Sequence, residues 1–568
     1  MRKIALFIVL QFMVSLVISA QNLLSPLWKI SFADTSETQQ EQFKIETWQD
    51  VNLLLSWERQ GYFWLNGKCC IANDFFVPEN FKNSELNLSI SLQCNVQSVF
   101  INGKFIGGNL PNQFWSNRDA RTDFVLQNNL IKPGVNRITI FANDLSYTGG
   151  RSYNFCSIAP KGVNDNFGLK ISIPFNDHLY SIDDEAIELK LNFGAKQKGI
   201  IKFSIVNDFH ESFIDKSYDV EEGEGTITVN LENEITQPGF YECVAIMNDG
   251  SYSSDVQWFA LSPEKIECTN NTVPRFKQYW DEALADLSKV QPEFNMIKVD
   301  SLCSANRDGY IVEMKSLGGL TIRGYYFVPR TVGKHAAVLH VPGYGYGWQY
   351  LNEFLSSTED VVELAICVRA HGISSDVFNP GFGVPGVWGH KLCSETENAY
   401  RAIYMDCVRA VEFLLSRPEV DASRIGVMGG SQGGGLTLAT AGLCSDKIKA
   451  CAYFDPFPCD TRDQLKIRTM CNSEIKNFLN FYNNECTFED ALSVQDLLDT
   501  KGFAKMIKCP AFFATALFDD DCPPHMGFAA YNGIASRKQF KIFPNDSHLG
   551  ESNPYGALMQ FLKSELKF

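Results

Sequence analysis

The sequence predicts a multidomain protein in which two all-β sandwich domains precede a doubly wound α/β domain with a mainly parallel sheet. Three observations support this fold class. The chain has 568 residues, which is too long for one core and enough for about three domains. Short segments of alternating polarity, separated by turn residues, fill its first half. From residue 263 onward, helical stretches alternate with short apolar strands.

The first sandwich is expected over residues 21–162. Polar and apolar residues alternate at 86–92, 98–101 and 136–142, and turn pairs such as Asn102-Gly103 separate these strands. Regular strands punctuated by turns are typical of a β-sandwich. The segments around 98–107 and 131–140 resemble the galactose-binding-like jelly roll, a module that accompanies many glycoside-processing enzymes.

Three tryptophans of this domain are candidates for stacking on a sugar face: Trp57, Trp64 and Trp115. The alternative is that they belong to the domain core, because the same fold also serves as plain scaffolding. The second sandwich is expected over residues 163–262, where strands at 186–193 and 225–231 alternate cleanly. It resembles an immunoglobulin-like domain without the paired cysteines, and we expect it to act as a spacer.

The segment 424–435 predicts a strand, a sharp turn and a helix, with a serine at the turn. Gly429 to Gly433 fits the pattern G-x-S-x-G, and Ser431 is its central residue. A nucleophile on so tight a turn needs neighbours without Cβ atoms, and the helix that follows approaches the sheet only over small side chains. The alternative is an ordinary strand–helix turn. In the expected domain at 263–568 this placement predicts a nucleophilic serine.

A serine hydroxyl needs a base, and the base needs a carboxylate that orients it. In α/β-hydrolases the acid and then the histidine follow the serine along the chain. Three acids, Asp519 to Asp521, follow the predicted strand at 511–516, and His548 follows the predicted strand at 539–543. The alternative for His548 is a surface loop histidine. The other histidines lack this order and strand-end placement; they are His178, His210, His335, His340, His371, His390 and His525.

The reaction also needs donors for the oxygen that becomes negative in the tetrahedral intermediate. The backbone N–H of Gln432, the residue after the nucleophile, is one expected donor. The glycine-rich segment 342–347 follows a predicted strand at 336–341, and we choose the N–H of Tyr344 as the second donor, with its ring lining the pocket. The alternative is that this segment is only a turn. The mechanism requires no metal and no organic cofactor.

Specific motifs lie in the catalytic part at 398–414, 417–421, 429–434, 522–524 and 528–532. With these motifs it closely resembles the acetyl xylan esterase and cephalosporin C deacetylase family, which is carbohydrate esterase family 7. The resemblance implies a serine esterase that removes acetyl groups from acetylated carbohydrates and other small acetates. It also implies that Ser431 is the nucleophile, Asp519 the acid and His548 the base, with Tyr344 and Gln432 as oxyanion donors.

Three departures from the family motifs lie near the expected site. The family's Arg-Gly-Gln is Arg369-Ala-His371 here, its His-Gly-Tyr is Pro342-Gly-Tyr344, and its His-Glu is His548-Leu549. The expected triad survives all three. The departures affect the pocket lining. The family often forms a hexamer, but with two added domains the sequence leaves self-association open.

Two other functions compete with the esterase. The same triad would serve a prolyl-oligopeptidase-like peptidase, and a carbohydrate-binding surface protein with an inactive hydrolase domain is the rival from a different class. The formal net charge of −16 provides no basic patch, which argues against nucleic acid as a partner.

The first twenty residues read as a signal peptide. Arg2 and Lys3 precede an apolar run at 4–18, and Ser19-Ala20 offers a cleavage point after Ala20. The run is short for a membrane span. We therefore expect an exported protein, periplasmic or extracellular. The 17 cysteines are scattered, odd in number and often in apolar contexts, which does not indicate a disulfide framework.

Overall fold

The computed structural model describes residues 22–568 except for several short segments. The expected signal peptide and two candidate sugar-stacking residues, Trp64 and Trp115, lie outside the described residues. The undescribed positions are 1–21, 33–42, 56, 58–59, 61–64, 82–84, 93, 111–121, 128, 146–154, 161–167, 185–186, 270–272, 346, 349–350, 382–386, 469, 549 and 551. In the part of the chain that the structure describes, no helix is both long and apolar enough to cross a membrane.

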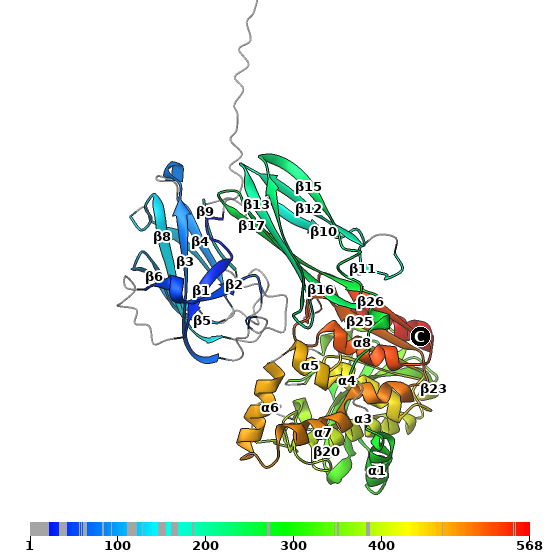
Figure 1. Cartoon of the computed structure of the whole chain (residues 1–568). Helices are drawn as coiled ribbons and strands as arrows, with labels where there is room; N and C mark the ends of the chain where they lie inside the picture. Colours follow the sequence, from blue (N-terminus) through cyan, green and yellow to red (C-terminus); the bar gives the residue numbers. More distant parts are fainter. Residues whose placement is uncertain are drawn as a thin grey trace, which may run out of the picture.

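The first sandwich is built from two antiparallel sheets that enclose one apolar core (Figure 1). Trp57 is 1% exposed within that core, so the interpretation that places it among core residues is correct. One sheet has the order β2 (Gln49–Asn52), β1 (Leu27–Ser31), β3 (Leu65–Val77), β8 (Gly134–Leu145), β5 (Asn95–Ile101) and β6 (Lys104–Leu110). The other has the order β7 (Thr122–Leu126), β4 (Leu86–Ser91) and β9 (Phe155–Pro160).

The second sandwich also consists of two sheets, and in Figure 1 it lies above the α/β part, with the first sandwich at its left. One sheet has the order β10 (Leu169–Ser172), β12 (Glu188–Ala195) and β15 (Gly223–Asn230). The other has the order β11 (Leu179–Tyr180), β17 (Tyr252–Leu261), β16 (Gly239–Asn248), β13 (Gly199–Asn207) and β14 (Ser212–Val220).

The α/β part is organised around one large mixed sheet, as the alternation of helices and strands predicts. Its first strands are antiparallel, and those from β22 to β26 pair in parallel. In the described residues its order is β18 (Asn295–Lys298), β19 (Arg307–Lys315), β20 (Thr321–Pro329), β22 (Val361–Cys367), β21 (His335–His340), β23 (Val420–Gly430), β24 (Ala450–Phe454), β25 (Ala511–Ala516) and β26 (Lys538–Phe543).

Helices cover both faces of this sheet, which makes it doubly wound. Helix α9 packs on one face, where Leu558 and Leu562 contact apolar residues of the parallel strands. The core on the other face includes residues of the remaining long helices. The helices are α1 (Phe276–Ser288), α2 (Asn352–Ser356), α3 (Ala399–Leu415), α4 (Gln432–Leu443), α5 (Thr461–Ile467), α6 (Met470–Phe481), α7 (Phe488–Leu498), α8 (Pro524–Gly533) and α9 (Pro554–Leu566).

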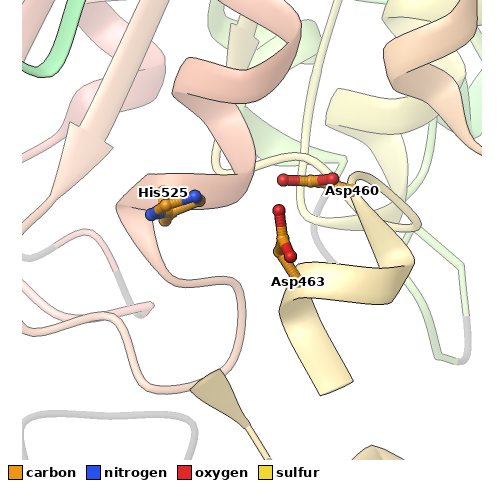
Figure 2. Close-up of side chains that lie close together, drawn as sticks. All are labelled: Asp460, Asp463 and His525. Carbon is orange, nitrogen blue, oxygen red and sulfur yellow. The ribbon is translucent and has the colours of Figure 1, made fainter. Parts of the chain in front are cut away.

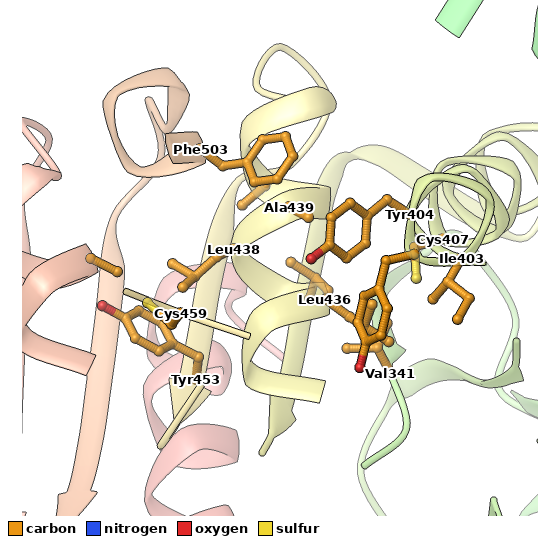
Figure 3. Close-up of a cluster of buried hydrophobic side chains, with 14 of the residues drawn as sticks. Val341, Ile403, Tyr404, Cys407, Leu436, Leu438, Ala439, Tyr453, Cys459 and Phe503 are labelled. Atoms are coloured by element: carbon orange, nitrogen blue, oxygen red, sulfur yellow. The ribbon is translucent and has the colours of Figure 1, made fainter. Parts of the chain in front are cut away.

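Helix α4 is the central helix of this arrangement, and its glycines let it lie close to the sheet. Figure 3 shows Leu436 and Leu438 of α4 among the side chains of α3 and β24. A Cβ atom on Gly433 would lie 2.5 Å from the carbonyl oxygen of Val341, and one on Gly434 would lie 2.6 Å from that of Phe454. Such contacts require glycine at both positions.

The second sandwich shares a hydrophobic core with the α/β part. Phe240 of β16 is 1% exposed, and its ring centroid is 5.7 Å from that of Phe528 in α8. Trp258 and Ala260 of β17 belong to the same apolar cluster as α8. A continuous apolar core joins the two parts, so the second sandwich packs against the α/β part and is more than a spacer.

Candidate active site

Ser431 occupies a strained turn between β23 and α4. Its φ of 58° and ψ of −128° lie where a side chain other than glycine is rarely found. The turn is fixed on both sides, because the Ser431 N–H donates to the carbonyl of Phe454 at 2.9 Å and the Ser431 carbonyl accepts from the N–H of Phe457 at 2.9 Å. Backbone strain of this kind persists only where the surroundings impose it, and it concentrates at functional sites.

Asp519 and His548 each follow one of two neighbouring parallel strands, β25 and β26, and the His548 ring lies 6.5 Å from the ring of Phe454, whose carbonyl binds the Ser431 N–H. The Nδ1 atom of His548 lies 2.7 Å from Oδ2 of Asp519. Oδ1 of Asp519 accepts backbone N–H bonds from Asp521 at 2.8 Å and Cys522 at 2.7 Å. The structure therefore pairs His548 with the first of the three acids in this loop. Because Nδ1 faces a carboxylate, Nε2 is the ring nitrogen left for proton transfer.

A second carboxylate approaches the other ring nitrogen. Oδ2 of Asp521 lies 3.4 Å from Nε2 of His548, and Oδ1 of Asp521 forms an ion pair of 2.6 Å with Nη1 of Arg468. Burial lowers the pKa of His548, but the charges of Asp519 and Asp521 outweigh it and raise this pKa to about 9. The unliganded site therefore favours the imidazolium at neutral pH.

Gln432 joins the serine turn to the glycine-rich segment after β21. Its side chain is fully buried, and Nε2 donates to the carbonyls of Pro342 at 3.3 Å and Gly343 at 3.4 Å. Gln432 is the first residue of α4, so its own N–H has no acceptor within the helix. Tyr344 is 40% exposed, and its hydroxyl accepts a 3.5 Å hydrogen bond from the N–H of Trp388.

His371 completes the support behind this segment, a role that the sequence reasoning did not assign to it. Its Nδ1 lies 3.0 Å from the carbonyl oxygen of Arg369, so Nδ1 carries the proton. Its Nε2 then accepts from Nε2 of Gln432 at 3.0 Å, and Oε1 of Gln432 accepts from the Tyr400 hydroxyl at 2.9 Å. Burial lowers the pKa of His371 to about 4, which keeps the ring neutral. The sequence signal for this role is the departure from the family motif, which has glutamine where this chain has His371.

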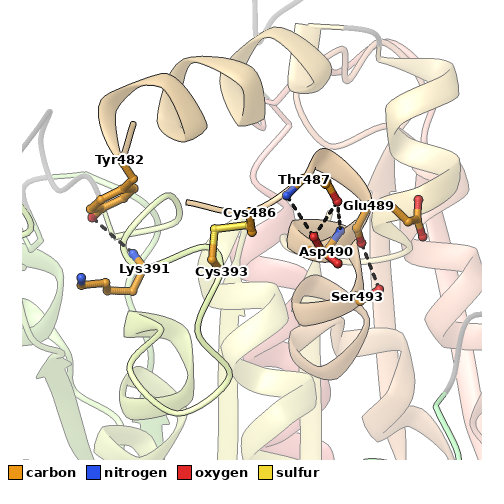
Figure 4. Close-up of a disulfide and its surroundings, with 8 residues drawn as sticks. All are labelled: Lys391, Cys393, Tyr482, Cys486, Thr487, Glu489, Asp490 and Ser493. Carbon is orange, nitrogen blue, oxygen red and sulfur yellow. Dashed lines mark hydrogen bonds between the residues drawn. A yellow bond between two sulfur atoms is a disulfide. The ribbon is translucent and has the colours of Figure 1, made fainter. Parts of the chain in front are cut away.

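The sequence leaves open whether any cysteines pair, and the part of the chain that the structure describes contains one disulfide. Cys393 and Cys486 are bonded and join the loop after residue 387 to the segment between α6 and α7 (Figure 4). That loop carries Trp388, whose ring is 5.9 Å from the ring of Phe478 in α6. Spacing alone did not reveal the pair, because the two cysteines are 93 residues apart. Most of the remaining cysteines are buried free thiols, as predicted.

A polar cluster away from the serine joins the second sandwich to the α/β part. Asp460, Asp463 and His525 are buried, and ligand-type atoms of the three lie within 4.8 Å of one another (Figure 2). The ammonium group of Lys501 already binds Asp460, and Nδ1 of His525 lies 2.9 Å from Oδ2 of Asp208 in the second sandwich. Internal cations therefore offset the carboxylates, and we interpret the cluster as an ion-pair network between domains.

The family model for acetyl xylan esterase (AXE1) matches residues 257–564, which is more than half of the chain. The chain belongs to the acetyl xylan esterase family. It is therefore a carboxylic ester hydrolase with an α/β-hydrolase fold. As a member of this family, it has acetylated carbohydrate as its substrate class.

The chain is similar to individual proteins with related names. Acetyl esterase Axe7A of Xylanibacter ruminicola is 25% identical over 413 residues, which cover 70% of this chain and 91% of that protein. A solved acetyl xylan esterase from Paenibacillus sp. R4 is 32% identical and covers 53% of this chain and 97% of its own, with a TM-score of 0.49. Acetyl xylan esterase 1 from Thermoanaerobacterium sp. JW/SL YS485 is 26% identical with the same coverage and a TM-score of 0.47.

Proposed function

We propose that this esterase deacetylates xylan or xylo-oligosaccharides with Ser431 as nucleophile, His548 as base and Asp519 as the acid that orients the base. The 2.7 Å contact between His548 Nδ1 and Asp519 Oδ2 is the observation that carries the proposal, and the strained turn at Ser431 supports it. A carboxylate behind a histidine orients a base, and a strained turn that presents a serine is typical of a nucleophile.

The reaction has two halves. Neutral His548 takes the hydroxyl proton of Ser431 as the oxygen attacks the acetyl carbonyl, and the imidazolium then protonates the departing sugar alcohol. Water, deprotonated by the same imidazole, hydrolyses the acetyl-enzyme. The N–H groups of Tyr344 and Gln432 stabilise the oxyanion in both halves. The buried Gln432 side chain supports this role, because it ties the segment of Tyr344 to the turn of Ser431.

Replacing the nucleophile tests the proposal. We expect Ser431→Ala to lower kcat on a chromogenic acetate by at least ~10⁴-fold, as removal of a triad member does in serine hydrolases. Ser423→Ala is the matched control, because Ser423 lies toward the opposite end of the same strand β23 and is exposed. A fluorophosphonate probe should label the parent and Ser423→Ala but not Ser431→Ala. Retention of most activity by a folded Ser431→Ala would refute the assignment.

The substrate class is tested by acetate release from acetylated xylan, from acetylated pectin fragments and from small acetates. The proposal expects the xylan substrates to be preferred at equal acetyl concentration. A preference for non-carbohydrate acetates would contradict it.

We also propose that the protein is exported after cleavage at Ala20. The support is the pattern of Arg2 and Lys3, the apolar run at 4–18 and the small residues before Gln21. N-terminal sequencing of the mature protein should begin at Gln21, and an intact Met1 in the mature protein would contradict cleavage.

A further inference from the structure

A second carboxyl group, that of Asp455, lies beside the acid Asp519. Asp455 directly follows β24, the strand between the serine strand β23 and the acid strand β25. Its side chain is fully buried, and its backbone φ of 35° lies in the left-handed region. An acidic residue in that conformation, with no access to solvent, needs a compensating set of contacts.

The contacts of Asp455 come from the next strand and from Asp519. Oδ1 accepts from the Thr515 hydroxyl at 2.6 Å, and Oδ2 accepts from the backbone N–H of Ala516 at 3.2 Å. The turn that carries Asp519 lies against Asp455, because the N–H of Asp519 donates to the carbonyl of the same Ala516 at 3.2 Å, and the carboxyl group of Asp519 approaches that of Asp455. Two ionised carboxylates offer acceptors only, so a hydrogen bond between them requires a proton on one of the two.

The surrounding donors decide which residue holds that proton. Asp519 accepts from two backbone N–H groups and from the His548 ring, three donors that all favour its ionised form. Asp455 has the Thr515 hydroxyl and one backbone N–H. Burial, together with the charge of Asp519, raises the pKa of Asp455 well above its ordinary value. The proton therefore belongs on Asp455.

We propose that Asp455 is a positioning residue of the esterase, which stays protonated at neutral pH and donates its O–H to the carboxylate of Asp519. With this bond Asp519 accepts four donors, and its remaining freedom to rotate away from His548 is removed. The donated bond also spreads the negative charge of Asp519, which limits how strongly Asp519 raises the basicity of His548. The role of this bond in turnover rests on the proposed triad.

The protonated state is tested without reference to activity. Infrared difference spectra of the full-length protein, parent minus Asp455→Asn, should contain the carbonyl stretch of an un-ionised carboxylic acid at pH 7. The same band should appear in a Ser431→Ala background, so the result does not depend on the nucleophile assignment. Absence of the band between pH 6 and pH 8 would overturn the proposal, even if the triad itself is correct.

The positioning role is tested by rate and pH together. Asparagine keeps an N–H donor toward Asp519, so Asp455→Asn should retain kcat within about 3-fold and the parent pH profile. Asp455→Ala removes the donor. We expect it to lower kcat/KM at pH 7 by about 10-fold and to move the acidic limb of the pH profile of kcat/KM to higher pH by about one unit. Loss of one hydrogen bond to the charged Asp519 is expected to shift the pKa of the base by about that amount.

Circular dichroism and the melting temperature show whether each variant is folded. A folded Asp455→Ala with the parent rate and the parent pH limb would overturn the role. Equal losses in folded Asp455→Asn and Asp455→Ala would overturn it as well, because then the donor is not what matters.

Discussion

The carboxylate of Asp521 gives the sharpest test of the electrostatics at the base. Asp521 Oδ2 lies 3.4 Å from Nε2 of His548, the nitrogen that must be free of a proton in the proposed mechanism. At 3.4 Å, two unit charges interact by about 1.2 kcal/mol in water and about 5 kcal/mol at an effective dielectric constant of 20. Asp521 is 31% exposed and paired with Arg468, which places the effect near the lower value.

Asp521→Asn should therefore lower the pKa of His548 by about one unit, since 1.36 kcal/mol corresponds to one pKa unit. The parent pKa is about 9, so only about 1% of the base is neutral at pH 7. After the substitution about a tenth should be neutral. We expect kcat/KM at pH 7 to rise by about 10-fold and to stay unchanged near pH 10.

The measurement is kcat/KM on a chromogenic acetate from pH 6 to pH 10, because this parameter reports the free enzyme. The sign is fixed by the chemistry: the neutral ring is active, so a raised pKa moves the rising limb to higher pH. Arg468→Gln is the opposing variant, because the charge of Arg468 lowers the pKa of His548. If Asp521→Asn leaves the limb where it is in the parent, the inferred coupling between Asp521 and His548 is wrong.

Two further predictions concern the surroundings of the site. Cys393→Ser should lower the melting temperature by about 5–10 °C, because the disulfide spans 93 residues and closing a loop of that length stabilises the fold by at most about 4–5 kcal/mol. Scanning calorimetry measures the shift. The control Cys268→Ser, at a half-buried free thiol, should leave the melting temperature unchanged. His371→Ala should lower kcat by about 10- to 100-fold and leave KM within about 3-fold, because Gln432 loses the acceptor that fixes the proposed oxyanion segment. His371→Gln should restore most of kcat, because its amide oxygen is again an acceptor for Gln432. Steady-state kinetics that show a change in KM alone would contradict this role.

Much of the fold and the site pairing could be predicted from local patterns. The apolar strands at 450–454 and 511–516 match β24 and β25, since buried parallel strands are short and uniformly apolar. The order of serine, acid and histidine selected Ser431 and His548, and the structure pairs His548 with Asp519 rather than with its neighbours. Whether these residues catalyse the reaction stays a prediction.

What the sequence did not predict depends on contacts between distant segments. Asp455 carries no motif, and its meaning comes from Thr515 and Asp519, about sixty residues later. The Cys393–Cys486 bond depends on how two segments 93 residues apart come together. The packing of Phe240 on Phe528 required knowing which face of the second sandwich meets α8. Alternation of polarity along a strand identifies a buried face and says nothing about its partner.

The continuous core between β16 and α8 limits how the enzyme can be divided. Helix α8 begins two residues after Cys522, which holds Asp519 through its N–H. A hydrolase fragment that starts at residue 263 would uncover the side of Phe528 that packs on Phe240 and remove a support from the loop that carries Asp519. Truncating this chain to the part that resembles its shorter relatives would expose an apolar surface and weaken the packing at the carboxyl end of the parallel strands.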